Sequence, residues 1–198
     1  MKIIFATSNQ GKLKEIREIL SDLDCEIISM KEAGVDINIV EDGDTFEANA
    51  LIKANTIMKL TGDIVLADDS GLEVDYLNKE PGIYSARYLG ENVSQKEKNR
   101  HILNKLDGVE KEQRTARFVC AVACAIPDKE SIVVRQTMEG YISNIEVGDN
   151  GFGYDPIFCP TQYDKTVAEL NAEQKNEISH RGKALRSIRN KLIENGVL

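Results

Sequence analysis

The chain has 198 residues, 41% of them hydrophobic, and a formal net charge of −8. This length is enough for one buried core, or for two small lobes that share a core, and it excludes several independent domains. The acidic balance argues against a nucleic-acid-binding surface, because such surfaces are basic. We therefore predict a single domain of residues 1–198, in which a phosphate ligand would have to be held by a local pocket.

The N-terminal segment and the cysteines indicate the compartment. Only four apolar residues, 3–6, precede Thr7, far too few for a secretion signal or a membrane span. Cys25, Cys120, Cys124 and Cys159 form no C-x-x-C pair, and reduced cysteine packs as a small hydrophobic residue. We expect a cytoplasmic protein without a membrane partner, a disulfide or a cysteine metal site.

Hydrophobic periodicity predicts strands and helices along the whole chain. The predicted strands are residues 2–6, 63–67, 115–126 and 131–142, the last two joined as a hairpin by the turn residues 127–130. The predicted helices are residues 12–20, 45–60, 94–106, 171–176 and 179–195, with a capping box at Ser94 and Glu97 and a stop at Gly62. This pattern predicts an α/β fold, a two-lobed subunit with a mixed, elongated central sheet flanked by helices and a cleft between the lobes.

The loop at residues 7–12, Thr-Ser-Asn-Gln-Gly-Lys, joins the first predicted strand to the first predicted helix. Backbone amides at a helix start, two hydroxyls and the Lys12 ammonium would converge there, which favours a phosphate. The loop has one glycine and no G-K-[ST], so it lacks the Walker pattern and by itself fits a plain polar turn as well.

Two acidic segments offer oxygen ligands to a divalent cation. Asp68 and Asp69 follow the segment 63–67, and adjacent carboxylates at the carboxyl end of a strand suit a metal that carries a triphosphate. Strand alternation would turn one of them inward and the other outward. Residues 41–44, Glu-Asp-Gly-Asp, form the second segment. Each segment also fits an Asp-rich turn.

Asn49 and Lys53 lie four residues apart and therefore on one face of the second predicted helix. The ammonium there can reach a phosphate or remain solvated. Phe152 stands between Gly151 and Gly153, where a flat ligand has room to stack on the ring, although a tight turn around a core aromatic fits the same residues.

The last predicted helix begins with His180 and Arg181, and Lys175 lies just upstream. Cations at a helix N-terminus oppose the helix dipole. Such a placement, with no evident structural gain, indicates a ligand that needs these donors.

Six segments, in this order, resemble motifs of the inosine triphosphate pyrophosphatase family, also called the Ham1-like proteins or XTP/dITP diphosphatases. They are T-S-N-Q-G-K, T-F-E-A-N-A-L-I-K-A, A-D-D-S-G-L, P-G-I-Y-S-A-R-Y, G-F-G-Y-D-P-I-F and I-S-H-R-G-K-A. The resemblance spans nearly the whole chain. It implies a homodimer whose subunits bind a nucleotide in the cleft between lobes, and Mg²⁺-dependent hydrolysis of XTP, ITP and dITP to the monophosphate and pyrophosphate.

Carried over by position, the resemblance makes Asp69 the general base and a metal ligand, with Glu41 as the second ligand. The acidic loop here reads Val-Glu-Asp-Gly, a spacing that departs from many members, so Asp42 remains an alternative to Glu41. The implied substrate-binding residues are Thr7, Ser8, Asn9, Gln10, Gly11, Lys12, Lys53, Ser70, Phe152, Gly153, Tyr154, Asp155, Lys175, His180 and Arg181.

Two other functions fit parts of the pattern. A Maf-type pyrophosphatase would act on pyrimidine or modified nucleotides, but the S-H-R segment after G-F-G-Y-D-P argues against it. A non-catalytic nucleotide sensor would lack the base or the metal ligands, whereas Glu41, Lys53, Asp68 and Asp69 are all present. The preferred purine and the preference between ribose and deoxyribose stay open.

Overall fold

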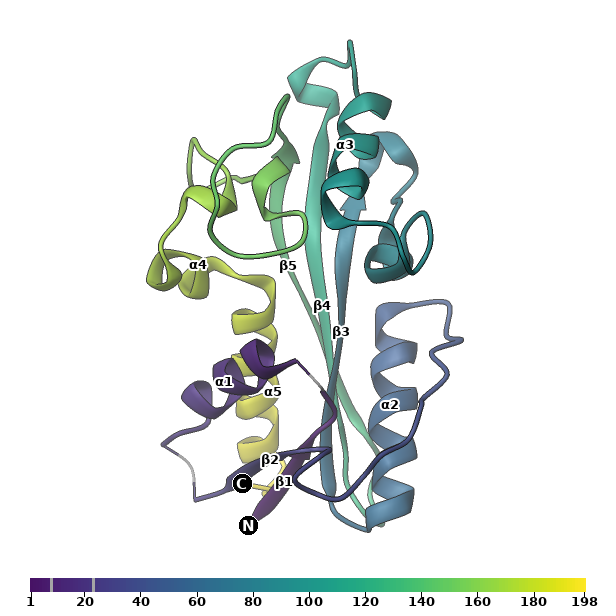
Figure 1. The fold of residues 1–198 in the computed structure, drawn as a ribbon. Helices are drawn as coiled ribbons and strands as arrows, with labels where there is room; N and C mark the ends of the chain where they lie inside the picture. The colour runs from purple at the N-terminus through teal and green to yellow at the C-terminus, as the bar shows by residue number, and fades with distance from the viewer. Residues whose placement is uncertain (8, 23) are drawn as a thin grey trace. The chain divides into compact units, whose positions relative to one another are not determined.

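The computed structural model describes residues 1–7, 9–22 and 24–198, and Figure 1 shows strands and helices along this part of the chain. The strands are β1 (Lys2–Phe5), β2 (Glu26–Ser29), β3 (Ile64–Val74), β4 (Thr115–Ala125), β5 (Ile132–Ile142) and β6 (Phe158–Pro160). The helices are α1 (Gln10–Ile19), α2 (Phe46–Thr61), α3 (Gln95–Lys105), α4 (Ala172–Ile178) and α5 (His180–Glu194), besides short 3-10 turns.

The strands form one mixed sheet in the order β2-β1-β3-β4-β5-β6. β1 pairs in parallel with both β2 and β3, so that Ile3 stands opposite Ile27 on one side and Ile64 on the other. β5 and β6 pair antiparallel. The predicted α/β class with a mixed sheet flanked by helices is therefore confirmed.

The chain divides into two compact units. The first comprises residues 1–69, 120–136 and 181–198, and the second comprises residues 70–119 and 137–180. The three long strands pass from one unit into the other, β3 after Asp69, β4 after Val119 and β5 after Gln136.

The core of the first unit lies between its strands and the helices α1 and α5. The inward positions predicted for the last helix are fully buried, namely Ala184, Leu185, Ile188 and Leu192, and they pack with residues of β1, β3 and β4. Figure 1 shows α1 and α5 on one side of these strands and α2 on the other. α2 begins at the cap Thr45, whose hydroxyl accepts from the amide of Ala48, and ends at Gly62, whose φ of 71° suits glycine.

Truncation of this core should be costly. We expect Ile188→Ala to lower the free energy of unfolding by about 2–5 kcal/mol, because it removes apolar contacts and leaves a cavity in a fully buried site. Urea unfolding followed by circular dichroism measures the change. The exposed Asn190 on the same helix serves as the control, since Asn190→Ala should change stability by less than about 0.5 kcal/mol.

The core of the second unit is built around β4, β5 and β6. Phe118 lies against Phe158 with ring centroids 4.6 Å apart, and Tyr154 belongs to the same buried cluster. α3 opens with the predicted capping box, in which the Ser94 hydroxyl and the Glu97 side chain each bind the other's backbone amide.

The sequence-based prediction of the strands fails in two respects. The segment after residue 67 does not turn at the paired aspartates, because β3 continues for eleven residues to Val74. Its neighbour β4 is equally long, and pairing with it outweighs the local preference of Asp, Ser and Gly for turns. The short strands β2 and β6 are also not predicted from hydrophobic periodicity.

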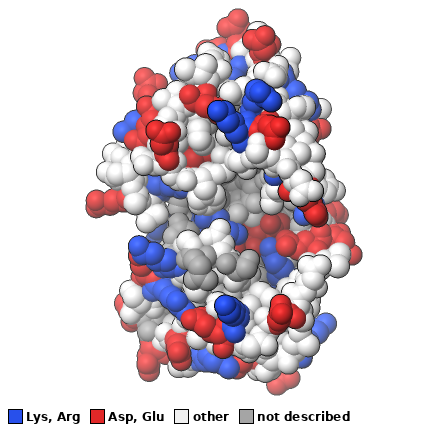
Figure 2. Space-filling view, viewed as in Figure 1, with Lys and Arg blue, Asp and Glu red and all other residues white. Residues whose placement is uncertain are grey.

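The surface carries charges of both signs, and the cysteines are reduced. Figure 2 shows basic and acidic side chains interspersed on the viewed face. Among the described residues, no helix is both long and apolar enough to cross a membrane. All four cysteines are free thiols, and burial raises the pKa of Cys120 and Cys124 to about 12.

Candidate active site

Asp68 is the centre of a buried ion cluster in the first unit. Its side chain is 1% exposed and receives the Lys12 ammonium of α1 at 2.7 Å and the Arg181 guanidinium of α5 at 3.4 Å. Burial alone would raise the pKa of Asp68, but the positive charges of Lys12 and Arg181 hold it well below its usual range. Arg181 at the start of α5 therefore has a buried structural partner. The interpretation that a cation at this position brings no structural gain is wrong for Arg181.

Asp69 lies on the opposite face of β3 from Asp68, as strand alternation requires. There it is close to a second group of charged residues, Lys53 and Glu41. Lys53 of α2 donates to the Glu41 carboxylate at 2.8 Å, and its Nζ is 4.0 Å from Oδ1 of Asp69. The Lys53 ammonium thus faces both Glu41 and Asp69, the two residues that the family resemblance assigns to a metal. Asp42 is exposed, whereas Glu41 is half-buried.

Asp69 differs from its neighbour Asp68 in the direction of its pKa shift. Burial raises the pKa of Asp69, and the nearby charges of Glu41 and Asp68 act in the same direction, while Lys53 and a hydrogen bond from Asn49 oppose the rise. A carboxylate with a raised pKa is a better proton acceptor than an ordinary aspartate, which suits a general base.

The loop that the sequence predicts as a phosphate site makes hydrogen bonds within itself. The Asn9 side chain caps α1 and accepts from the amides of Gly11 and Lys12 at 2.9 and 3.2 Å, while the Asn9 amide donates to the Thr7 hydroxyl. A phosphate that used these two amides would have to replace the Asn9 oxygen. Ser8 and the side chain of Gln10 lie outside the described residues.

A pocket of about 740 Å³ in the first unit is lined by some of these charged groups. It is lined by residues of the β1–α1 connection, the segment 29–39 and the acidic cluster, among them Thr7, Lys12, Glu41, Lys53 and Asp68. This volume falls within the range of small-molecule sites, and its polar groups are both cationic and anionic.

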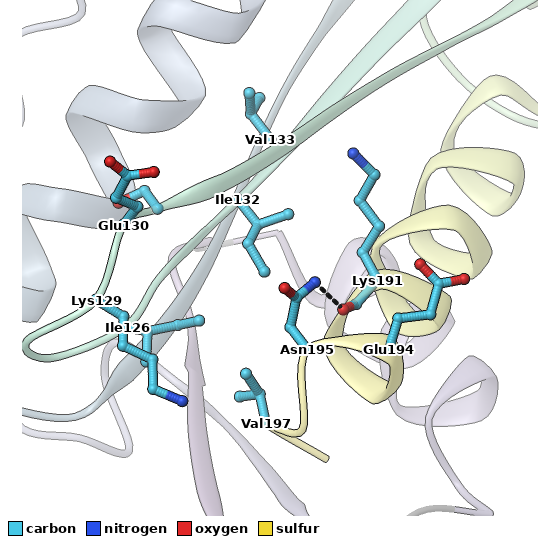
Figure 3. Close-up of a pocket in the computed structure, with 10 residues that line it drawn as sticks. Ile126, Lys129, Glu130, Ile132, Val133, Lys191, Glu194, Asn195 and Val197 are labelled. Carbon is cyan, nitrogen blue, oxygen red and sulfur yellow. Dashed lines mark hydrogen bonds between the residues drawn. The ribbon is translucent and has the colours of Figure 1, made fainter.

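A different pocket of about 540 Å³ lies in the same unit between the β4–β5 turn and the end of α5 (Figure 3). Its lining includes the apolar side chains of Ile132 and Val197 and the charged side chains of Lys129, Lys191 and Glu194, all labelled in Figure 3. None of the residues that line it belongs to the predicted active site.

In the second unit, three of the residues predicted to bind substrate form a compact group, namely Phe152, Asp155 and Lys175. Phe152 is 59% exposed, and the Lys175 ammonium lies 4.6 Å from the centre of its ring. Lys175 also binds the Asp155 carboxylate at 2.6 Å, and Asp155 accepts from the Phe152 amide at 2.9 Å. The loop therefore presents one aromatic ring with a cation beside it.

The other residues of the second unit that are predicted to bind substrate are less accessible than Phe152. Tyr154 is buried and donates its hydroxyl to the backbone carbonyl of Ser85 at 2.8 Å. His180 is buried and stacks on Phe118 with ring centroids 5.0 Å apart. Ser70 is half-buried in β3, and Gly153 adopts a φ of 63°.

The donor set of the first unit fits a magnesium ion. Mg²⁺ in nucleotide enzymes is held through one or two carboxylates together with substrate phosphates and water. Glu41 and Asp69 face the same ammonium and so provide two such carboxylates. Among the described residues, no group of three or more His, Cys, Asp or Glu side chains forms a complete protein cage.

The fold and the pocket define an α/β protein in which carboxylates and lysines surround a cavity suited to a phosphate ligand. The chain belongs to the Ham1 family, whose model matches residues 3–191. The family resemblance inferred from the six motifs is confirmed.

Relatives and solved structures cover nearly the whole chain. Proteins named dITP/XTP pyrophosphatase from Bacillus licheniformis and Bacillus subtilis are 49% and 48% identical to it, over 94% and 96% of this chain and 95% and 96% of theirs. The Ham1 protein of Staphylococcus aureus superimposes with a TM-score of 0.91 at 43% identity, covering 98% of this chain and 100% of that one. A HAM1 protein from Coxiella burnetii gives 0.92 at 40% identity, covering 98% and 99%.

Proposed function

We propose that the chain hydrolyses the non-standard purine triphosphates XTP, ITP and dITP to the monophosphate and pyrophosphate. The observation that carries the proposal is the first-unit pocket, in which Lys12 and Lys53 stand next to Glu41 and Asp68. Three relatives that are 46–49% identical to this chain over nearly its full length are named dITP/XTP pyrophosphatase, and these names support the same activity.

The triphosphate is held by charge. Lys12 and Lys53 offset the negative charge of the phosphate oxygens, and the residues of the loop 7–12 provide further donors once the Asn9 side chain moves off the helix start. Phosphoryl transfer needs mainly charge neutralisation and in-line positioning, so these contacts supply most of what the reaction requires.

Asp69 activates the water. The water oxygen forms a bond to the α-phosphorus, the bond between that phosphorus and the bridging oxygen breaks, and the proton of the water passes to Asp69. Pyrophosphate leaves with its charge balanced by Lys12 and Lys53. The raised pKa of Asp69 makes it the better proton acceptor of the adjacent pair, since Lys12 and Arg181 keep Asp68 ionised.

Glu41 and Asp69 would hold the magnesium ion, which when bound supplies additional neutralisation of the phosphate charge. We expect chelation by excess EDTA to abolish turnover and added Mg²⁺ to restore it, because two lysines alone leave part of the triphosphate charge uncompensated. Pyrophosphate release measured before and after chelation tests this. Full activity in excess EDTA would refute the metal assignment.

The predicted substrate-binding residues around Phe152 would select the base. Phe152 offers a stacking face to any purine, so discrimination has to come from groups that reach the base edge. Xanthine and hypoxanthine carry an oxygen at C6, which accepts from a donor such as Lys175, whereas adenine carries a donor there. Donors that remain unpaired disfavour the wrong base by up to about 10⁴–10⁵-fold.

A panel of triphosphates tests the proposed function. We expect kcat/KM for XTP, ITP and dITP to be well above that for GTP, with ATP lowest or near it, because guanine shares the 6-oxo group and adenine does not. Pyrophosphate release from all five under identical conditions gives the ranking. Equal rates for ATP and ITP would contradict base selection, and binding without turnover would favour a nucleotide sensor.

The homodimer and the cytoplasmic location stay predictions. Sedimentation at several concentrations tests the first, and fractionation of cells tests the second.

A further inference from the structure

The Asn49 side chain connects the two acidic segments of the first unit. It is 1% exposed, donates from Nδ2 to Oδ2 of Asp69 at 3.1 Å and accepts at Oδ1 from the amide of Gly43 at 2.9 Å. We propose that Asn49 is a positioning residue, which orients the Asp69 carboxylate and fixes the loop of Glu41 beside it. The inference deepens the proposed function and rests on the role of Asp69 in it.

The chemistry of the two contacts requires an amide at this position. The Gly43 amide can only donate and an ionised Asp69 can only accept, so the residue between them must present an acceptor on one side and a donor on the other. Asparagine meets both needs with one rigid group. Aspartate would keep the acceptor toward Gly43 but would place a second carboxylate against Asp69.

The acidic loop lies close enough to α2 for Asn49 to determine its position. A Cβ atom on Gly43 would come within 2.7 Å of the Ala48 side chain and 2.8 Å of Oδ1 of Asn49. No side chain fits there without a shift, so the glycine permits the close approach that the hydrogen bond needs. Glu41 lies two residues before this anchored point.

The next turn of α2 completes the arrangement. Lys53, four residues after Asn49 on the same face, binds Glu41 and faces Oδ1 of Asp69, while Asn49 holds Oδ2. The two oxygens of Asp69 are therefore distinguished by their partners, one an amide and the other an ammonium. Removal of a residue that hydrogen-bonds a metal ligand typically lowers activity or metal affinity by about 10–100-fold.

A purely structural role would give a different result. Asn49 is buried with two hydrogen bonds, and loss of such a residue can lower stability without touching the reaction. A double-mutant cycle separates the two roles, because a residue that acts through Asp69 has little left to act on once Asp69 is changed.

The test compares Asn49→Ala, Asp69→Asn and the double variant, with kcat and KM for dITP and XTP measured well below the melting temperature. We expect Asn49→Ala to lower kcat about 10–100-fold with KM within about threefold, since the residue orients a catalytic group. In the Asp69→Asn background the same change should lower kcat by less than about threefold. Effects that multiply in the double variant would overturn the proposal.

Asn49→Asp distinguishes the two hydrogen bonds and also serves if Asn49→Ala fails to fold. Its kcat should fall at least tenfold, because it loses the donor to Asp69, while hydrogen exchange by NMR should find the Gly43 amide as protected as in the wild type. In Asn49→Ala that amide should exchange faster. Wild-type kcat in Asn49→Asp would overturn the orienting role.

Asn55→Ala is the matched control. Asn55 lies on the same helix, and its Oδ1 accepts a hydrogen bond from the Ser131 hydroxyl at 2.9 Å, away from the acidic segments. Its kcat should stay within about twofold of the wild type, as for a substitution outside the reacting groups. If the wild type hydrolyses neither dITP nor XTP, the proposed function fails, whereas an active wild type with an unaffected Asn49→Ala variant defeats this inference alone.

Discussion

Asp69→Asn should lower kcat for dITP and XTP by about 10²–10⁴-fold, because the amide keeps the shape of the side chain but cannot accept the proton of the attacking water. The fold should be retained, since an asparagine at this position can still accept the hydrogen bond from Asn49 through its oxygen. Steady-state kinetics together with thermal unfolding measures both effects.

Asp44→Asn provides the control for the loss of one negative charge in the same region. Asp44 is exposed, follows Gly43 in the acidic loop and has no role in the proposed chemistry. Its kcat should remain within about twofold of the wild type, as for an ordinary surface substitution. An Asp69→Asn variant that kept more than about half of the wild-type kcat would exclude a general base at this position.

Asp68→Ala should act on stability more than any surface change. We expect the free energy of unfolding to fall by about 3–5 kcal/mol, because the substitution removes the buried carboxylate that Lys12 and Arg181 share. Urea unfolding with a probe of the first unit measures the loss. Adjacent aspartates should thus differ, one contributing mainly to stability and the other mainly to turnover.

Glu18→Ala is the matched control for a lost ion pair. Glu18 pairs with Lys14 at 3.7 Å on the exposed face of α1. Removal of such a surface pair should cost less than about 1 kcal/mol. A loss below about 1 kcal/mol for Asp68→Ala as well would show that the buried cluster adds nothing beyond an ordinary surface pair.

The sequence predicts those parts of the fold whose signal is local. The capping box of Ser94 and Glu97 and the buried stripe of α5 depend on residues within a few positions of one another, and both are confirmed. The continuation of β3 through Asp68 and Asp69 could not be predicted in this way, because its cause is the neighbouring strand β4 and not the residues themselves.

The candidate site shows the same division. The pairing of Asp68 with Arg181 joins residues 113 positions apart, and only the unexplained cations at the start of α5 hinted at it. The bridge from Asn49 to Asp69 and Gly43 gives no sequence signal beyond the placement of Asn49 and Lys53 on one helix face. Contacts of this kind depend on tertiary packing, which periodicity and spacing do not encode.

Hydrolysis in H₂¹⁸O tests the proposed reaction most directly. If water attacks the α-phosphorus of dITP or XTP, mass spectrometry will find ¹⁸O in the nucleoside monophosphate and none in the pyrophosphate. Label in the pyrophosphate, or release of the nucleoside diphosphate and orthophosphate, would place the attack at another phosphorus and contradict the proposed mechanism.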